Sequence, residues 1–88
     1  MGKNRRQVPA HLAEKLLTIR RCLGLSQSQL GRMLGFTRSF NRVSQYEHGN
    51  HEPNLMVLLA YARVARVRVE LLIDDEQELP ERFSHGSI

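Results

Sequence analysis

The stretch LTIRRCLGLSQSQLGRMLGF, residues 17–36, contains two apolar helical repeats separated by a glycine and a serine. Gly24 is the type of residue that ends a helix in the left-handed conformation. Ser26, two positions later, is a strong N-cap for a following helix. The stretch therefore predicts the end of one helix, a short turn and a second helix from Gln27 to about Leu34, closed by Gly35.

Upstream of Gly24, apolar residues recur at steps of three and four positions, which is typical of a helix with one buried stripe. The residues of this stripe are Leu12, Leu16, Ile19 and Leu23. Pro9 suits the first position of this helix. In the second helix, the residues expected to face inward are Leu30, Met33 and Leu34.

Downstream, the pattern predicts three more helices. A third runs from about Phe40 to His48 and is closed by Gly49, and a fourth starts at Pro53 and ends near Ala65. The residues of the fourth helix expected to face inward are Leu55, Leu58, Leu59, Ala62 and Ala65. A last turn, residues 69–73, is expected to close the core with Leu71, Leu72 and Ile73.

These elements predict an all-α fold, a compact five-helix bundle whose second and third helices form a helix-turn-helix pair. The bundle is expected to span residues 9–73. A basic flexible arm, residues 1–8, precedes it. An acidic tail, residues 74–88, follows it and has no confident helical pattern.

Charge divides the chain into two unequal parts. Residues 1–68 hold twelve of the thirteen Lys and Arg and three acids, a net charge of +9, whereas residues 69–88 have a net charge of −5. Eleven of the thirteen cations are arginine, whose planar guanidinium suits bidentate contact with phosphate or guanine. The basic part is expected to meet a polyanion, and the alternative is an ordinary solvated basic surface.

The composition argues against several other classes of protein. Eighty-eight residues make one small domain, which is too small for a large buried catalytic cleft. Cys22 is the only cysteine, so no intrachain disulfide or four-cysteine zinc site can form, which fits the cytoplasm. The longest apolar run, residues 55–62, is too short to span a bilayer, and the basic N-terminal stretch is followed by no apolar signal core.

No pattern in the chain indicates an enzyme or a cofactor. We find no activated nucleophile, no paired catalytic carboxylates and no glycine-rich phosphate loop. His48 and His51 have no third ligand near them, so no metal site is expected. The functions that remain are binding functions.

Three segments together resemble a known family: residues 17–36 quoted above, VSQYEHGNHEPNL (43–55) and LLAYARVARVRVELLI (58–73). They look like the DNA-binding domain of lambdoid phage repressor and Cro proteins, the Xre family of bacterial helix-turn-helix regulators. The resemblance covers about residues 12–73 and implies a lambda-repressor-like fold. In that fold the second helix crosses the DNA backbone and the third lies in the major groove.

The chain departs from the family pattern at three places. Gly31 stands where alanine is usual, and Arg66 stands where a glycine normally caps the fourth helix. From Gly35 to Glu47 the chain spans twelve positions where about ten are usual. Two starts of the third helix fit this lengthening: an N-cap at residue 39 after a longer turn, or an N-cap at residue 37 with half a turn added.

The third helix provides the candidates for base recognition. With Val43 facing inward, Asn41 and Gln45 share the outer face, with Arg42 beside them. Amide side chains pair with adenine and arginine pairs with guanine. The predicted base-reading residues are Asn41, Arg42, Ser44 and Gln45. The alternative is a solvated polar face.

The resemblance implies two further groups of residues. Arg20 in the first helix is expected to pair with Glu47 at the end of the third, which would fix the orientation of that helix. The candidates for phosphate contact that follow from the resemblance are Gln27, Asn50 and His51. Position and charge add Arg38 and Ser39 beside the reading face, and Lys3, Arg5 and Arg6 as an arm along the DNA. The alternative for the last three is a disordered basic terminus. His48 is a further candidate.

The sequence thus predicts a cytoplasmic regulator of transcription that binds double-stranded DNA sequence-specifically, as a homodimeric repressor reading the major groove with the helix at about 40–48. The dimer surface is expected among Leu71, Leu72, Ile73 and Leu79. An alternative hypothesis is an antitoxin or protein-binding adaptor that also binds DNA. Its acidic tail would engage a partner through Leu79 and Phe83.

Overall fold

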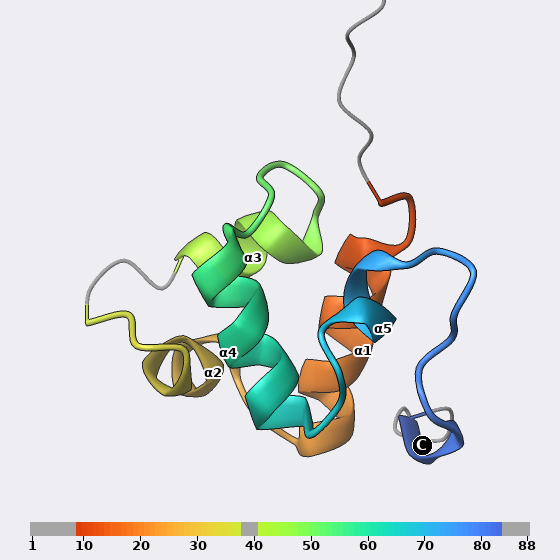
Figure 1. The fold of residues 1–88 in the computed structure, drawn as a ribbon. Helices are drawn as coiled ribbons and strands as arrows, with labels where there is room; N and C mark the ends of the chain where they lie inside the picture. The colour runs from red at the N-terminus through yellow and green to blue at the C-terminus, as the bar shows by residue number, and fades with distance from the viewer. Residues whose placement is uncertain (1–8, 38–40, 84–88) are drawn as a thin grey trace, which may run out of the picture.

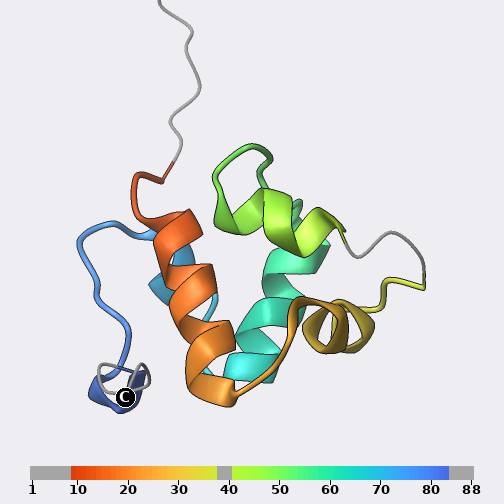
Figure 2. The same cartoon turned by 180° about the vertical axis from the view of Figure 1, so that it is seen from behind.

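The computed structural model describes residues 9–37 and 41–83, and every regular element within them is helical. The helices are α1 (Leu12–Leu23), α2 (Gln27–Met33), α3 (Asn41–Glu47), α4 (Leu55–Ala65) and α5 (Glu70–Ile73), followed by a 3₁₀ turn, η1 (Glu81–Phe83). The predicted all-α, five-helix fold is confirmed. Helices α2, α3 and α4 lie on one side of α1, and the chain after α5 runs along the opposite side (Figure 1, Figure 2).

The turn between α1 and α2 has the predicted caps. Gly24 is left-handed, with φ of 71°, and ends α1. Ser26 and Gln29 form a reciprocal capping box at the start of α2: the Ser26 hydroxyl accepts from the Gln29 N–H at 3.0 Å, and the Gln29 Oε1 accepts from the Ser26 N–H at 2.8 Å.

Two prolines lie outside the helices that they were predicted to start. The N-cap of α1 is His11, so Pro9 precedes the helix. Asn54 caps α4, because its Oδ1 accepts from the Val57 N–H at 2.9 Å. The N-cap of α4 is therefore Asn54, directly after Pro53, and the helix itself begins at Leu55.

The core is formed mainly by α1 and α4. Its buried apolar residues are Leu12, Leu16, Ile19, Leu30, Val43, Tyr46, Val57, Leu58, Tyr61, Ala62, Ala65, Leu72 and Phe83. Four residues predicted to face the core are exposed instead: Leu23 is 38%, Met33 55%, Leu55 80% and Ile73 42% exposed. Residues 55–62 are apolar on every side, so more apolar side chains are available than one helical face can bury.

Helix α4 ends at an unusual residue. Arg66 has φ of 59°, and it is the one non-glycine residue with positive φ among the residues described. Its N–H still bonds to the Arg63 carbonyl, at 3.2 Å, so the helix ends where the family's glycine would end it. A left-handed conformation costs a residue with a side chain about 1–2 kcal/mol.

We therefore expect Arg66→Gly to stabilise the domain by about 0.5 kcal/mol, because part of this gain is offset by the greater entropy of glycine in the unfolded chain. Urea denaturation followed by circular dichroism would measure the change. Arg68→Gly, at an exposed position without positive φ, is the control and should destabilise. A loss of stability in Arg66→Gly would contradict this account of the cap.

The acidic segment after α5, residues 74–83, packs on the bundle, so close packing continues beyond the predicted end of the bundle at residue 73. Lys15, a buried residue of α1, directs its ammonium into this segment. It donates to the main-chain carbonyls of Leu71 at 2.6 Å, Asp74 at 3.0 Å and Gln77 at 2.8 Å. These bonds use all three ammonium donors and join α1 to the start of the acidic segment.

The end of the segment is anchored by Phe83, which is 3% exposed and belongs to the core. Its carbonyl accepts from the Cys22 thiol at 3.1 Å, and Leu79 also packs against the core. Arg82 next to it donates to the carbonyls of Ala65 and Arg66 at 2.8 and 3.0 Å. The prediction that Phe83 and Leu79 are anchors for a partner is therefore wrong, because hydrophobic burial places them within the chain's own fold.

Asp75 of the acidic segment holds the two residues that precede α1. Its carboxylate accepts from the N–H of Ala10 at 2.8 Å and from that of His11 at 3.1 Å. These two bonds hold the pKa of Asp75 below its ordinary value of 3.8. The side-chain bond from Gln77 and the Glu76 N–H lower the pKa of Asp74 in the same way.

A lowered carboxyl pKa makes docking of this segment dependent on pH. The stabilisation is present above the unfolded-state pKa of about 4 and is lost as the pH falls through the lower pKa of the folded state. We expect the Ala10 and His11 amide signals to move towards unbonded positions as the pH falls below about 4. An NMR titration would test this, with Asp75→Asn as the comparison, and an equal response in that variant would contradict it.

Candidate nucleic-acid interface

Helix α3 has a buried face and a polar outer face. Val43, Tyr46 and Glu47 are buried, whereas Asn41 and Arg42 are exposed. Ser44 and Gln45, the other two predicted base-reading residues, are half-buried. All four therefore lie outside the core, with Val43 at the inward position expected from the sequence.

An aromatic contact ties the turn before α3 to the helix itself. The ring of Phe36 lies 6.4 Å from that of Tyr46, centroid to centroid. The guanidinium of Arg42 sits 5.1 Å from the centroid of the Phe36 ring, which is a cation–π distance. This contact holds the guanidinium of Arg42 beside the ring, and the residue is still exposed. Sequence reasoning missed Phe36, although an aromatic residue directly after the glycine that ends α2 was a usable signal.

Arg20 and Glu47 form a buried ion pair between α1 and the end of α3. The Glu47 carboxylate accepts from Arg20 Nε at 2.6 Å and from Nη2 at 3.1 Å, a bidentate arrangement. Arg20 Nη1 also donates to the Leu25 carbonyl at 3.0 Å. The Glu47 side chain is only 2% exposed, so its charge depends on this partner. The pair sets the orientation of α3 on the bundle.

Gln27 joins the same network from the start of α2. Its Nε2 donates to Glu47 Oε1 at 3.1 Å. An amide nitrogen carries two hydrogens, so one remains for another acceptor. The half-buried Gln27 side chain therefore lies at the junction of the two helices, directly beside the first backbone N–H groups of α2.

The loop after α3 folds back on the helix. The N–H groups of Asn50 and His51 donate to the Gln45 carbonyl at 2.9 and 3.4 Å, and both side chains are exposed. His48 Nδ1 lies 2.7 Å from the Ser44 carbonyl and therefore carries a hydrogen, because a carbonyl only accepts. The loop thus presents Asn50 and His51 at the end of α3.

The remaining candidates lie outside the described residues. These are Arg38 and Ser39 in the turn, and Lys3, Arg5 and Arg6 in the N-terminal arm. The two alternative starts of α3 concern residues 38–40, which also lie outside. Within residues 9–37 and 41–83, no group of three His, Cys, Asp or Glu side chains could hold a metal ion. No helix there is long and apolar enough to cross a membrane.

Helices α2 and α3 are two short helices joined by a turn. A buried ion pair holds α3 on the bundle, and the outer face of α3 is polar. This arrangement defines a helix-turn-helix protein. The helix-turn-helix family model matches residues 16–72, and the chain belongs to this family. Such proteins are DNA-binding regulators and not enzymes.

Two solved structures show the same fold. The crystal structure of the P22 c2 repressor protein in complex with a synthetic operator has a TM-score of 0.66 and 28% identity, over 80% of this chain and 98% of the repressor chain. The solution structure of the DNA-binding domain of the same repressor has a TM-score of 0.66 and 25% identity, over 91% and 99% of the two chains. No curated protein sequence matches this chain.

Proposed function

We propose that this chain is a sequence-specific regulator that binds double-stranded DNA as a homodimeric repressor and reads the major groove with α3. The observation that carries the proposal is the outer face of α3, which the Arg20–Glu47 pair holds outward on the bundle. The likeness to a repressor solved with its operator supports it. The cytoplasm, where the genome of a bacterium lies, is the proposed location.

Within this proposal, the four side chains on α3 read base edges. The amides of Asn41 and Gln45 pair with adenine, Arg42 pairs with guanine, and Ser44 contributes a single hydrogen bond. The Arg42 guanidinium rests beside the Phe36 ring at an exposed position, so part of its side-chain entropy is already lost before binding.

The phosphate contacts surround this face. Gln27 offers its second amide hydrogen together with the first N–H groups of α2, where a helix N-terminus favours an anion. Asn50 and His51 contact the backbone from the loop after α3. The sequence adds five residues to this set, namely Arg38, Ser39, Lys3, Arg5 and Arg6.

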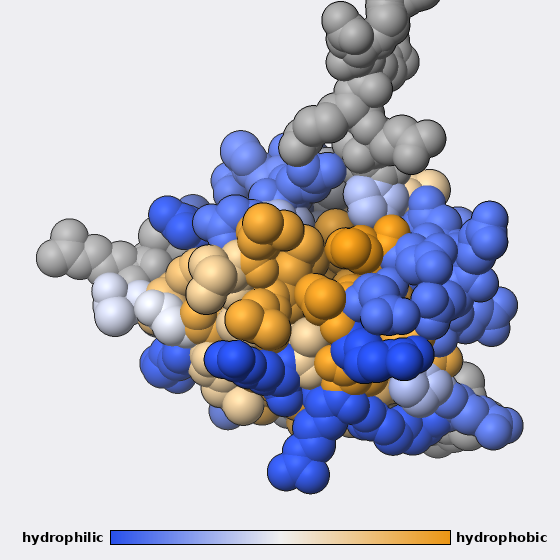
Figure 3. All heavy atoms as spheres, in the orientation of Figure 1, coloured by the Kyte–Doolittle hydropathy of each residue, from blue (hydrophilic) through white to orange (hydrophobic). Residues whose placement is uncertain are grey.

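The proposed dimer uses an exposed apolar surface over α4 and α5 (Figure 3). Leu55 is 80%, Met56 70% and Ile73 42% exposed. The surface predicted from the sequence needs correction, because Leu72 is fully buried and Leu79 packs against the core. Exposed apolar residues that gather on one face of a small domain are typical of an interface.

Binding to a preferred duplex and to a scrambled duplex of equal length tests the function. Asn41→Ala, at an exposed position, is expected to weaken binding to the preferred duplex about tenfold and to leave the scrambled duplex unaffected. Gln27→Ala is expected to weaken both, because phosphate contacts carry no sequence information. If Asn41→Ala and Gln45→Ala leave the preference unchanged, α3 does not read bases.

The alternative, a partner-binding adaptor, is not favoured. Its proposed anchor Phe83 is buried in the chain's own core, and two hydrogen bonds from Lys15, to the carbonyls of Asp74 and Gln77, hold the start of the acidic segment. A partner would have to break these contacts before it could bind.

A further inference from the structure

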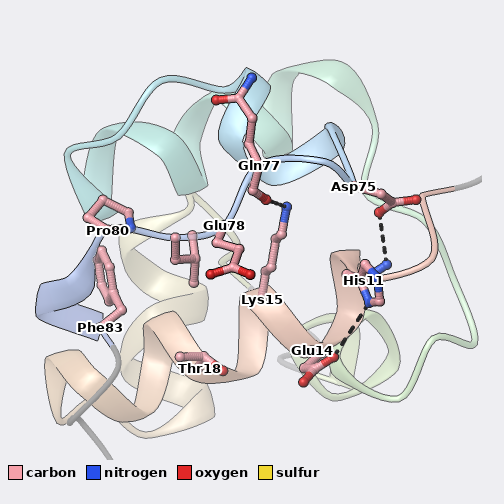
Figure 4. Close-up of a pocket in the computed structure, with 10 residues that line it drawn as sticks. His11, Glu14, Lys15, Thr18, Asp75, Gln77, Glu78, Pro80 and Phe83 are labelled. Atoms are coloured by element: carbon pink, nitrogen blue, oxygen red, sulfur yellow. Dashed lines mark hydrogen bonds and ion pairs between the residues drawn. The ribbon is translucent and has the colours of Figure 1, made fainter.

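A cavity of about 370 Å³ lies between α1 and the acidic segment, on the side of the molecule away from α3. It is lined by His11, Glu14, Lys15, Thr18, Asp75, Gln77, Glu78, Leu79, Pro80 and Phe83. In Figure 4 the rings of Pro80 and Phe83 stand at one end, Asp75 and His11 stand at the other, and Glu78 lies between them. One wall is therefore apolar, and the remainder is rich in carboxylates.

The charges of this cavity favour a cation. Three carboxylates line it, those of Glu14, Asp75 and Glu78. Lys15 is the one Lys or Arg among the lining residues, and its three donors are all directed at main-chain carbonyls. A cation in the cavity would thus meet carboxylate oxygens, and its apolar stem would meet Pro80 and Phe83. A guanidinium suits these carboxylates because it bonds to them bidentately. The Phe83 ring already carries the guanidinium of Arg82, at 4.4 Å from its centroid, so a second arginine would meet the ring only with its apolar stem.

The chain itself contains such a group close by. Residues 1–8 directly precede the part of the chain that lines the cavity from His11 onward, and they include Arg5 and Arg6. Arg5 precedes Pro9 by four residues, so the main chain between them spans at most about 14 Å, whereas the stretch of α1 from His11 to Thr18 is about 10 Å long. An arm of this length reaches every part of the cavity.

We propose that this cavity is a docking site for an arginine of the chain's own N-terminal arm, Arg5 or Arg6. Because the proposed function assigns the same arginines to DNA phosphates, the cavity and DNA compete for the arm. The acidic segment then acts as an internal competitor, which lowers DNA affinity and opposes binding to any duplex irrespective of its sequence. This regulatory role rests on the proposed function, but the docking itself does not.

Docking is tested without DNA. The amide NMR signals of Thr18, Glu78 and Leu79 in the full chain are expected to shift in the variant Arg5→Gln/Arg6→Gln, and 0.5 M salt should produce the same shifts in the unsubstituted chain. Lys3→Gln, a charge change in the same arm, is the control and should shift them less. Unmoved cavity signals in the double arginine variant would overturn the proposal, whatever the result with DNA.

Competition is tested on DNA. Glu14→Gln/Glu78→Gln is expected to bind a scrambled duplex about threefold more tightly at 50 mM salt, and the gain should disappear near 0.5 M salt. Glu70→Gln/Glu76→Gln removes two exposed carboxylates that do not line the cavity, and it controls for net charge.

In a chain lacking residues 2–8, the cavity variant and its control should have equal effects. A persistent difference between them without the arm would show that the cavity acts on DNA directly and would overturn the competition. If no variant binds any duplex, the proposed function fails, while the NMR result still decides whether the arm docks.

Discussion

Replacing Phe83 with alanine is expected to lower the free energy of unfolding by about 3 kcal/mol. The ring is 3% exposed and belongs to the core, although it lies ten residues beyond α5. Truncation removes buried apolar area and leaves a cavity, and both effects destabilise the fold. In a domain of this size the expected fall in melting temperature is more than 10 °C.

Thermal and urea denaturation followed by circular dichroism would measure this change. Met33→Ala is the matched control, because Met33 is apolar but 55% exposed and lies outside the proposed dimer surface, and its loss should change stability by less than about 1 kcal/mol. NMR would also show whether the Lys15 and Asp75 contacts of the acidic segment weaken in Phe83→Ala. A variant as stable as the unsubstituted protein would mean that the segment is not part of the fold.

Replacing Glu47 with alanine is expected to destabilise the protein by about 3 kcal/mol or more. The substitution leaves the Arg20 guanidinium, which is 16% exposed, without its bidentate partner. It also removes the acceptor of Gln27, so α3 loses its connections to both α1 and α2 at one point.

A double variant separates the stranded charge from the loss of packing. Arg20→Met/Glu47→Met keeps the apolar volume and leaves no unpaired charge, so it should be more stable than Glu47→Ala alone. Chemical denaturation of both variants gives the comparison. If the double variant were the less stable of the two, the cost of Glu47→Ala would not arise from an uncompensated charge.

Features set by neighbouring residues in the sequence were predictable. The end of α1 at Gly24 follows from the backbone conformation that glycine allows. The N-cap at Ser26 follows from a hydrogen bond to the N–H three residues later. The structure has both features. The inward position of Val43 follows from helical periodicity. The face of α4 was partly missed, because residues 55–62 are apolar all round and only the neighbouring helices decide which side is buried.

Features set by distant residues were not predictable from the residues alone. Lys15 looks like a surface lysine in the sequence, yet it bonds to carbonyls 56 to 62 positions away. Phe83 lies in a segment whose charge indicates solvent exposure, and its burial depends on the surface that α1 offers. In the candidate site, the pairing of Arg20 with Glu47 was implied by the family resemblance, whereas the bond from Gln27 to Glu47 was missed.

The central claim, that α3 reads DNA sequence in a dimer, is tested most directly by selecting preferred duplexes from a random pool with the full chain and with Asn41→Ala/Gln45→Ala. The account predicts that the full chain enriches an inverted repeat whose half-sites are about 10 base pairs apart, centre to centre, and that the variant loses this preference but keeps weak general binding. Enrichment of the same sequence by both proteins, or of no sequence by the full chain, would contradict it.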